Sequence, residues 1–240
     1  MGGADAEVRV TVDGALAEVV LNRPAKRNAL TTAMVDTITR FVRGLPQSVR
    51  VILVRGEGPA FCGGADLAAS AASDDFHRGL FAMLDEFVHQ HRIVVSYVHG
   101  PAVGAGMEIM LASDLVVMEP RAWCELPPAR LGFALDNWSI RRLADIVGLG
   151  HARSILLACE RVTATRAVEI GLAHEVGNLD DAHALCARVG SYPPLGIAEL
   201  KAVLNDACYT HELSPEHQRL FDAAWAEARR QRRYQLVRGL

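Results

Sequence analysis

Two glycine-rich segments of the chain could present backbone N–H groups to an anion. In VILVRGEGPAFCGGADL an apolar run leads into Gly63-Gly64, and in YVHGPAVGAGM another run leads into Gly104-Ala105-Gly106. Glycine permits a sharp backbone turn and leaves no Cβ between the amides and a ligand. At the start of a helix those N–H groups are unpaired, and the helix dipole favours negative charge. Two such turns facing each other would stabilise a developing oxyanion, with one donor worth about 3–4 kcal/mol.

Each turn alone has a plainer interpretation as a tight connection between a strand and a helix, and that alternative stays open here. Dinucleotide binding is a weaker interpretation. Gly104-x-Gly106 lacks a third glycine at the spacing of that motif, and no early βαβ unit surrounds it.

Three acidic residues lie at or after the second turn. Glu108 stands within an otherwise apolar helical pattern, where a carboxyl group is costly unless it is paired or functional. Glu125 precedes two prolines, and we expect a surface charge near Arg130. Asp136 could cap the following helix by accepting a hydrogen bond from the N–H group of Trp138 or Ser139.

The elements that must position these residues alternate in type over the first half of the chain. The patterns predict a hairpin and then strands over residues 8–12, 17–21, 49–54, 93–98 and 114–118. They predict helices from the threonines at 31 and 32 to about 43, and over 76–88 and 104–111. From residue 136 onward the pattern is mostly helical, over 136–147, 151–158, 165–170, 179–189, 194–205 and 215–233. This order predicts an α/β fold with the last helices as an appendage.

Composition excludes several classes of protein. The 240 residues carry a net charge of −3 and half of them are apolar, so no general attraction to nucleic acid or to a membrane surface is indicated. The longest apolar region, residues 93–112, is interrupted by His99, glycines and Glu108, so we expect no membrane insertion. Five scattered cysteines disfavour a disulfide framework or a zinc site, and we expect no metal and a reducing cytoplasm.

Several motifs occur in a fixed order along the chain. They are LNRPAKRNAL, FCGGADL, GPAVGAGMEI, SDLVV and ARLGFALD followed by RRL, within residues 21–30, 61–67, 100–109, 113–117 and 129–143. With this order and spacing the chain resembles the crotonase (enoyl-CoA hydratase/isomerase) family over nearly its whole length.

The resemblance implies an α/β fold, the crotonase (ClpP-like) spiral of ββα turns. Residues 1–190 would form an acyl-CoA-binding core, and residues 191–240 a helical region that packs a homotrimer or a hexamer. The ligand would be an acyl-CoA thioester, with coenzyme A as part of the substrate and no separate cofactor. The N–H groups of Ala65 and Ala105 would bind the thioester oxygen. The CoA-binding residues would be Ala25, Lys26, Arg27, Gly64, Asp66 and Leu67, the first three at the adenine-phosphate end.

The acids depart from the family pattern. Hydratases of the family use two glutamates, and the resemblance places the first at Glu108 but the second at Pro128, which has neither acid nor base. Asp136 matches an aspartate that dienoyl-CoA isomerases use as an acid/base and aryl-CoA dehalogenases as a nucleophile. Capping and catalysis by Asp136 therefore remain equal alternatives.

Two functions stay open. The first is an enoyl-CoA hydratase/isomerase homologue, a lyase or isomerase with weak or atypical hydration because its acid/base pair is incomplete. The second is a non-catalytic carrier of long-chain acyl-CoA, since GFALDNWSIRRL resembles an actinobacterial subgroup of hydratase-like proteins. The substrate pocket would then be lined by Pro128, Phe133, Leu135 and Trp138. Pro128 favours the carrier and Glu108 favours the enzyme.

Overall fold

The computed structural model describes residues 6–68 and 74–205, with the single residues 219, 222, 223, 226 and 230. Most of the helix expected over 215–233 lies outside these residues. Within them, no helix is long and apolar enough to cross a membrane.

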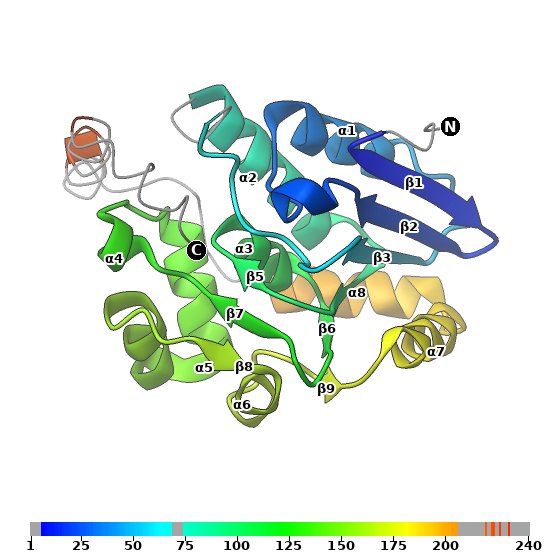
Figure 1. Cartoon of the computed structure of the whole chain (residues 1–240). Helices are drawn as coiled ribbons and strands as arrows, with labels where there is room; N and C mark the ends of the chain where they lie inside the picture. Colours follow the sequence, from blue (N-terminus) through cyan, green and yellow to red (C-terminus); the bar gives the residue numbers. More distant parts are fainter. Residues whose placement is uncertain are drawn as a thin grey trace.

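A largely parallel sheet forms the centre of the molecule (Figure 1). Its strands, in spatial order, are β1 Val8–Asp13, β2 Leu16–Leu21, β3 Val51–Gly56, β4 Ile93–Val98, β6 Leu115–Met118 and β9 Glu175–Val176. The predicted hairpin is confirmed, because β1 and β2 pair antiparallel, whereas each later pair is parallel. Spatial order follows chain order, so the chain winds steadily in one direction.

Three short extended segments form a second, smaller sheet. It contains β5 Ala102–Val103, β7 Trp123–Glu125 and β8 Val162–Thr163. Isolated bridges join Cys62 to Ala102 and Leu30 to Ala65 at its margin. The winding of strand, short strand and helix matches the expected ββα spiral. Segments of two or three residues carry no readable period, which is why the sequence did not predict these strands.

Helices cover both faces of the main sheet (Figure 1). One face packs on α1 Thr32–Arg43, α2 Asp74–His89 and α3 Ala105–Ala112, and the other on α7 Leu179–Gly190. In β3, Ile52 and Val54 point to the first group, whereas Val51 and Leu53 point to α7. Burial on both faces explains the apolar run that opens β3 and the largely apolar β4, in which Ser96 is the polar exception.

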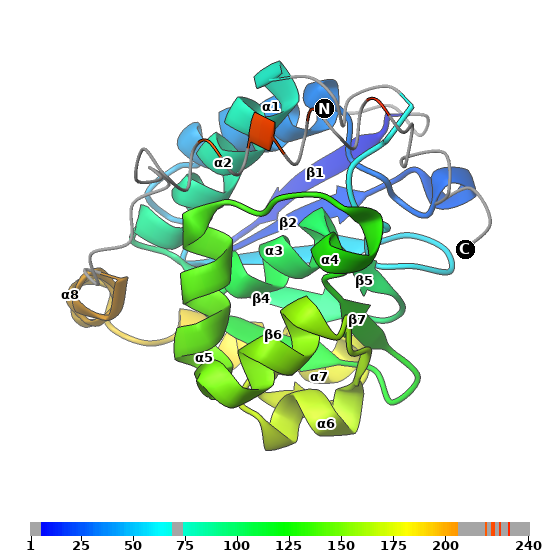
Figure 2. The same cartoon turned by 90° about the vertical axis from the view of Figure 1, so that its left-hand side faces the viewer.

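The remaining helices are the 3-10 turn η1 Pro24–Lys26, α4 Pro128–Leu131, α5 Asn137–Leu157, α6 Ala164–Glu169 and α8 Pro194–Asn205. Of these, α4, α5 and α6 lie near the second sheet (Figure 2). The two helices predicted over 136–147 and 151–158 are continuous in α5 except at Gly148, whose φ of 77° is non-helical. Glycine adopts that conformation without a steric penalty.

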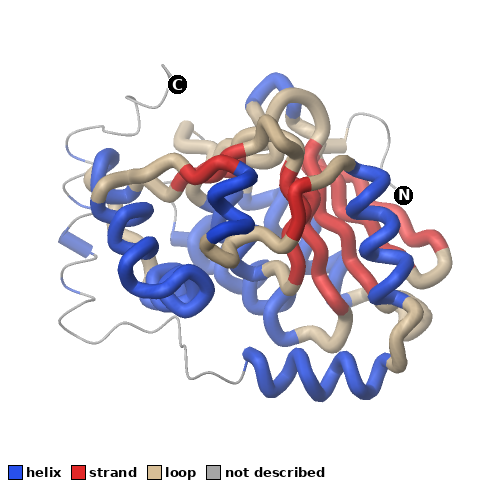
Figure 3. Tube along the Cα trace, turned by 90° about the horizontal axis from the view of Figure 1, so that it is seen from below, coloured by secondary structure: helices blue, strands red, loops and turns tan. Residues whose placement is uncertain are grey.

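Helix α8 lies at the edge of the molecule (Figures 2 and 3), and a buried lysine is one of the residues that attach it. Lys201 is 5% exposed. Its Nζ donates to the carbonyl oxygens of Phe87 and Arg92 at 2.8 Å and pairs with Asp114 at 2.5 Å. Burial lowers the pKa of Lys201, and the charge of Asp114 opposes that shift. The division of the chain at residue 190 remains a prediction.

Candidate active site

The two glycine-rich turns face each other. A Cβ on Gly104 would lie 3.8 Å from Cα of Gly64. A Cβ on Gly64 would lie 3.0 Å from the Val103 oxygen and 3.9 Å from the Ala105 nitrogen. Both glycines also have positive φ, 101° at Gly64 and 55° at Gly104. Only glycine satisfies both the close approach and the backbone conformation.

Each turn contributes one N–H group with no backbone acceptor among the described residues. Ala105 is the first residue of α3, so its N–H has no carbonyl one turn earlier. On the first turn, Leu30 N donates to Gly64 O and Asp66 N donates to Leu30 O, both at 2.8 Å. The Ala65 N–H between them points away from this pairing. Two unpaired donors on adjacent turns can bind one oxygen atom that carries negative charge.

Backbone contacts fix the two turns against each other. Cys62 N donates to Pro101 O at 3.1 Å, and Val103 N donates to Cys62 O at 2.9 Å. α3 approaches so closely that a Cβ on Gly106 would lie 2.4 Å from Cys62 O. On its other side, Gly104 N donates to Glu125 O at 3.0 Å. The donors are therefore held by rigid neighbours, as an anion site requires.

Asn28 attaches the expected CoA-binding loop to the first turn. It is fully buried, and its Oδ1 accepts from Arg23 N at 2.8 Å. Its Nδ2 donates to the oxygens of Glu57 and Ala60 at 2.9 and 2.8 Å. These bonds hold Asn28 at a φ of 56°. Asparagine tolerates a left-handed conformation better than most residues, but no local pattern marks Asn28 as the residue that joins these two loops.

The predicted CoA-binding residues divide into an exposed group and a packed group. Ala25, Lys26 and Arg27 are exposed on and just after η1, where they are accessible to a phosphate. Asp66 is occupied instead, because its Oδ2 pairs with Arg23 at 3.0 Å and both side chains are 15% exposed. Leu67 is half-buried. Their roles in binding CoA remain predictions.

The fold brings Glu108 and Asp136 together from different helices. Glu108 lies on α3 and is 7% exposed, whereas Asp136 begins α5 and is 4% exposed. Burial, followed by the charge of Asp136, raises the pKa of Glu108 from its usual 4.5 to about 8. Such a carboxyl group is protonated near neutral pH and can act as an acid.

Asp136 also caps α5, as expected. Its Oδ1 accepts a hydrogen bond from Ser139 N at 3.0 Å. The Ser139 hydroxyl lies 2.6 Å from Asp136 Oδ2 and 3.2 Å from Glu108 Oε1. Capping and proximity to Glu108 are therefore compatible, and a catalytic role for Asp136 stays a prediction. The sequence predicts Ser139 only as a backbone donor, because the contact of its hydroxyl with Glu108 depends on the packing of α3 against α5.

The expectation that Glu125 is a surface charge is wrong. It is 3% exposed and pairs with Arg130 at 2.6 Å and Arg161 at 3.6 Å. The guanidinium of Arg161 also stacks over Trp123, 3.7 Å from the ring centre. The pairing with Arg130 is as expected, and burial results from the short strand β7, which the sequence did not reveal.

Pro128 begins α4 and is half-buried. At the first helical position its missing N–H leaves no hydrogen bond unmade. Among the residues expected to line an acyl tunnel, Trp138 is 4% exposed within the main core and Leu135 packs partly buried against that core. Phe133 is half-buried, and its N–H donates to Pro128 O at 3.0 Å. A tunnel lined by these residues remains a prediction.

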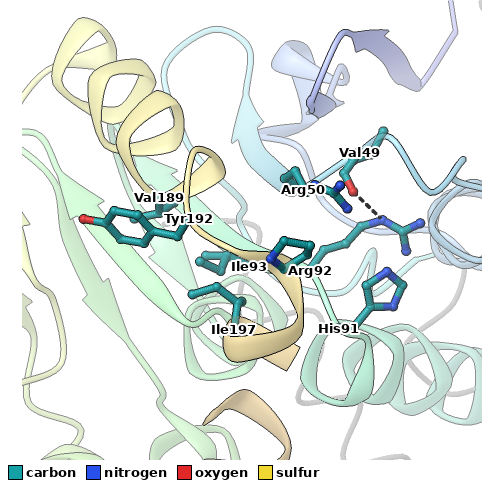
Figure 4. A pocket seen from close by; sticks show the side chains of 9 residues that line it. Val49, Arg50, His91, Arg92, Ile93, Val189, Tyr192 and Ile197 are labelled. Atoms are coloured by element: carbon teal, nitrogen blue, oxygen red, sulfur yellow. Dashed lines mark hydrogen bonds between the residues drawn. The ribbon is translucent and has the colours of Figure 1, made fainter. Parts of the chain in front are cut away.

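A small pocket lies away from these groups (Figure 4). It is lined by Val49, Arg50, His91, Arg92, Ile93, Val189, Tyr192, Pro194 and Ile197. The first five of these residues precede or begin β3 and β4, and the other four lie at the end of α7, the start of α8 and the turn between them, whereas the glycine turns follow the opposite ends of the same strands. Arg92 donates to Val49 O at 3.3 Å and Leu45 O at 2.8 Å, which is a structural role. Within the described residues, no group of three or more His, Cys, Asp or Glu could hold a metal ion.

Known proteins resemble this chain over most of its length. The family model described as enoyl-CoA hydratase/isomerase matches residues 11–232. A probable enoyl-CoA hydratase, echA6, from Mycobacterium tuberculosis is 40% identical over 219 residues, which cover 91% of this chain and 90% of that protein. Carnitinyl-CoA dehydratase from Proteus mirabilis is 32% identical over 222 residues, covering 87% and 83%.

Solved structures show the same fold. An enoyl-CoA hydratase from Mycobacterium avium subsp. paratuberculosis superposes with a TM-score of 0.80 at 28% identity, covering 93% of this chain and 97% of that one. With the family model matching most of its length and the expected fold present, this chain belongs to the enoyl-CoA hydratase/isomerase family.

Proposed function

We propose that this protein binds fatty acyl-CoA thioesters and stabilises the thioester enolate between the N–H groups of Ala65 and Ala105. The observation that carries this proposal is the contact between the two glycine turns, each of which presents one N–H that bonds no backbone acceptor among the described residues. A thioester oxygen gains negative charge when its α-carbon loses a proton, so two fixed donors favour the enolate over the neutral thioester. The exposed Lys26 and Arg27 would contact the CoA phosphates.

Within this proposal Glu108 exchanges a proton with the substrate, and Asp136 is its partner. With a pKa of about 8, Glu108 is mostly protonated near neutral pH; its ionised fraction takes the α-proton and its protonated form returns one to the enolate. Hydration of a double bond also needs a second group that activates water. Pro128 cannot do this, so we propose weak or atypical hydration.

Exchange of α-protons tests the enolate directly. We would incubate butyryl-CoA with the protein in deuterated water and follow loss of the α-proton signal by NMR. The wild type is expected to exchange, and Glu108→Gln to exchange about 10²–10⁴-fold more slowly. Both should bind the ligand equally, because the oxygen donors are backbone groups. Glu175→Gln, at an exposed position on β9, is the matched control and should exchange like the wild type.

A second function, a non-catalytic acyl-CoA carrier, is favoured by Pro128. Binding of long-chain acyl-CoA without any α-proton exchange would establish the carrier and refute the enzyme. Absence of binding would refute both.

Hydration of crotonyl-CoA is a separate test of the role of Pro128. The wild type should hydrate it about 10²–10⁴-fold more slowly than an efficient hydratase, and Pro128→Glu should hydrate it faster than the wild type.

We also propose a homotrimer or hexamer packed through the C-terminal helices. The outer side of α8 supports this, since Leu195, Leu200, Val203 and Leu204 are 85%, 57%, 65% and 73% exposed. Adjacent exposed apolar side chains of this kind typically mark an interface. Analytical ultracentrifugation at micromolar concentration should show a trimer or larger, and a monomer would refute the assembly.

The cysteines of the described residues, Cys62, Cys124, Cys159 and Cys186, are free thiols. This supports the proposal of a reducing cytoplasmic location.

A further inference from the structure

Ser139 lies between the two acids of the candidate site. It is fully buried at the third position of α5. Its Oγ is 2.6 Å from Asp136 Oδ2 and 3.2 Å from Glu108 Oε1. Asp136 and Glu108 are thereby joined through one hydroxyl group.

A hydroxyl has a single hydrogen and can donate it to only one of two carboxyl groups. The shorter contact, to Asp136, has the length of a strong O–H···O⁻ hydrogen bond. If that hydrogen is given to Asp136, Ser139 Oγ can bond Glu108 only as an acceptor. Glu108 must then donate, which requires its carboxyl group to carry a proton.

The surroundings place the negative charge on Asp136. Asp136 accepts from Ser139 N at the start of α5, where the helix dipole favours an anion. Glu108 lies within a helix whose residues are all buried. Burial of Glu108 raises its pKa to about 8, in agreement with a proton at this position, whereas a hydrogen bond donated by Ser139 would lower that pKa, so the direction of the Ser139 bond decides the sign of its effect.

Other ionisable groups around α3 leave this arrangement undisturbed. The thiol of Cys62 is neutral, because burial raises its pKa to about 12. On β7, Glu125 is paired with two arginines. Arg142 on α5 donates to Leu111 O at the far end of α3. The buried residues that α2 contributes are apolar: Phe76, Leu80, Met83, Leu84, Phe87 and Val88.

We propose that Ser139 is a positioning residue that joins Glu108 and Asp136 into one proton-sharing unit, with the proton on Glu108 and the charge on Asp136. Its catalytic consequence rests on the proposed function. When Glu108 delivers its proton to the α-carbon of the enolate, the negative charge moves from the enolate to Glu108. The Ser139 hydroxyl can then rotate from Asp136 to Glu108, and no covalent bond of serine forms or breaks.

The sign of one pKa change tests the proposal without any substrate. The Glu108 carboxyl carbon would be followed by NMR in protein labelled at glutamate, with its signal identified by its loss in Glu108→Gln. In the proposed unit the serine makes two hydrogen bonds while Glu108 is protonated and one after it ionises. Ser139→Ala should therefore lower the titration midpoint of Glu108 by about one pH unit, a tenfold loss of proton affinity.

Three further variants complete the test. Ser139→Thr keeps the hydroxyl and should restore the wild-type midpoint. Ser113→Ala, which removes another buried serine at the end of α3, should leave the midpoint unchanged. Ser139→Cys, a weaker hydrogen-bonding group, should also lower the midpoint and replaces Ser139→Ala if that variant does not fold.

A midpoint that rises or stays constant in Ser139→Ala would overturn the proposal. A rise would mean that the hydroxyl donates to an ionised Glu108 instead. Absence of α-proton exchange together with the expected fall would refute the proposed enzyme function while leaving the proton-sharing unit intact.

Discussion

Replacing Glu108 by glutamine should remove a pH dependence from the stability of the protein. Glutamine has the shape of a protonated glutamate and can donate to Ser139, but it does not titrate. In the folded protein the pKa of Glu108 is about 8, against 4.5 as its usual value. Between these values the folded state holds a proton that the unfolded state has lost. The stabilising contribution is therefore complete below the unfolded pKa and disappears as the pH rises through the folded pKa.

The magnitude follows from the width of that window. Each pH unit is worth about 1.4 kcal/mol for one group, so from about pH 5 to pH 8 the wild type should lose about 4 kcal/mol relative to Glu108→Gln. At the lower pH the two proteins should differ by about 1 kcal/mol or less, because the hydrogen bonds are conserved. At the higher pH the variant should be clearly more stable.

Urea unfolding at several pH values measures this difference. The protein concentration must be fixed, since the stability of an oligomer depends on it. The exposed Glu175→Gln is the control, and its difference from the wild type should not vary with pH. Parallel stability curves for the wild type and Glu108→Gln would show that Glu108 is ionised in the folded protein, and the acid role given to it would be wrong.

Three other perturbations have defined outcomes. Gly64→Ala should abolish α-proton exchange and cost about 1–3 kcal/mol of folding free energy, because its Cβ would lie 3.0 Å from the Val103 oxygen at a φ of 101°. If the variant exchanged α-protons as fast as the wild type, the role assigned to this turn would be wrong. Lys201→Met should destabilise the fold by about 3–5 kcal/mol in thermal or urea unfolding, since Asp114 loses its buried partner. A cost below about 1 kcal/mol would show that water replaces the ammonium group. Leu204→Glu, 73% exposed on α8, should leave the fold intact by circular dichroism but dissociate the oligomer in ultracentrifugation; an unchanged sedimentation coefficient would place the interface elsewhere.

Much of the fold could be read from the sequence because its elements are local and strongly patterned. The apolar runs of β3 and β4, the hairpin and the helix α8 lie within a few residues of their predicted bounds. The glycine turns were also predictable, since positive φ and close approach leave few alternatives to glycine. The resemblance carried by the ordered motifs predicted the family, which the family model confirms.

Tertiary packing decided which side chains meet, because such contacts depend on distances between helices that no local pattern encodes. Glu125 is buried because it lies on the short strand β7 of the second sheet. The residue that was expected to be a surface charge therefore pairs with Arg130 as a buried carboxylate. Asp136 was predictable as a helix cap from its position alone. Its connection to Glu108 through Ser139 required α3 and α5 to pack side by side, and burial there determines that the Glu108 carboxyl group keeps its proton near neutral pH.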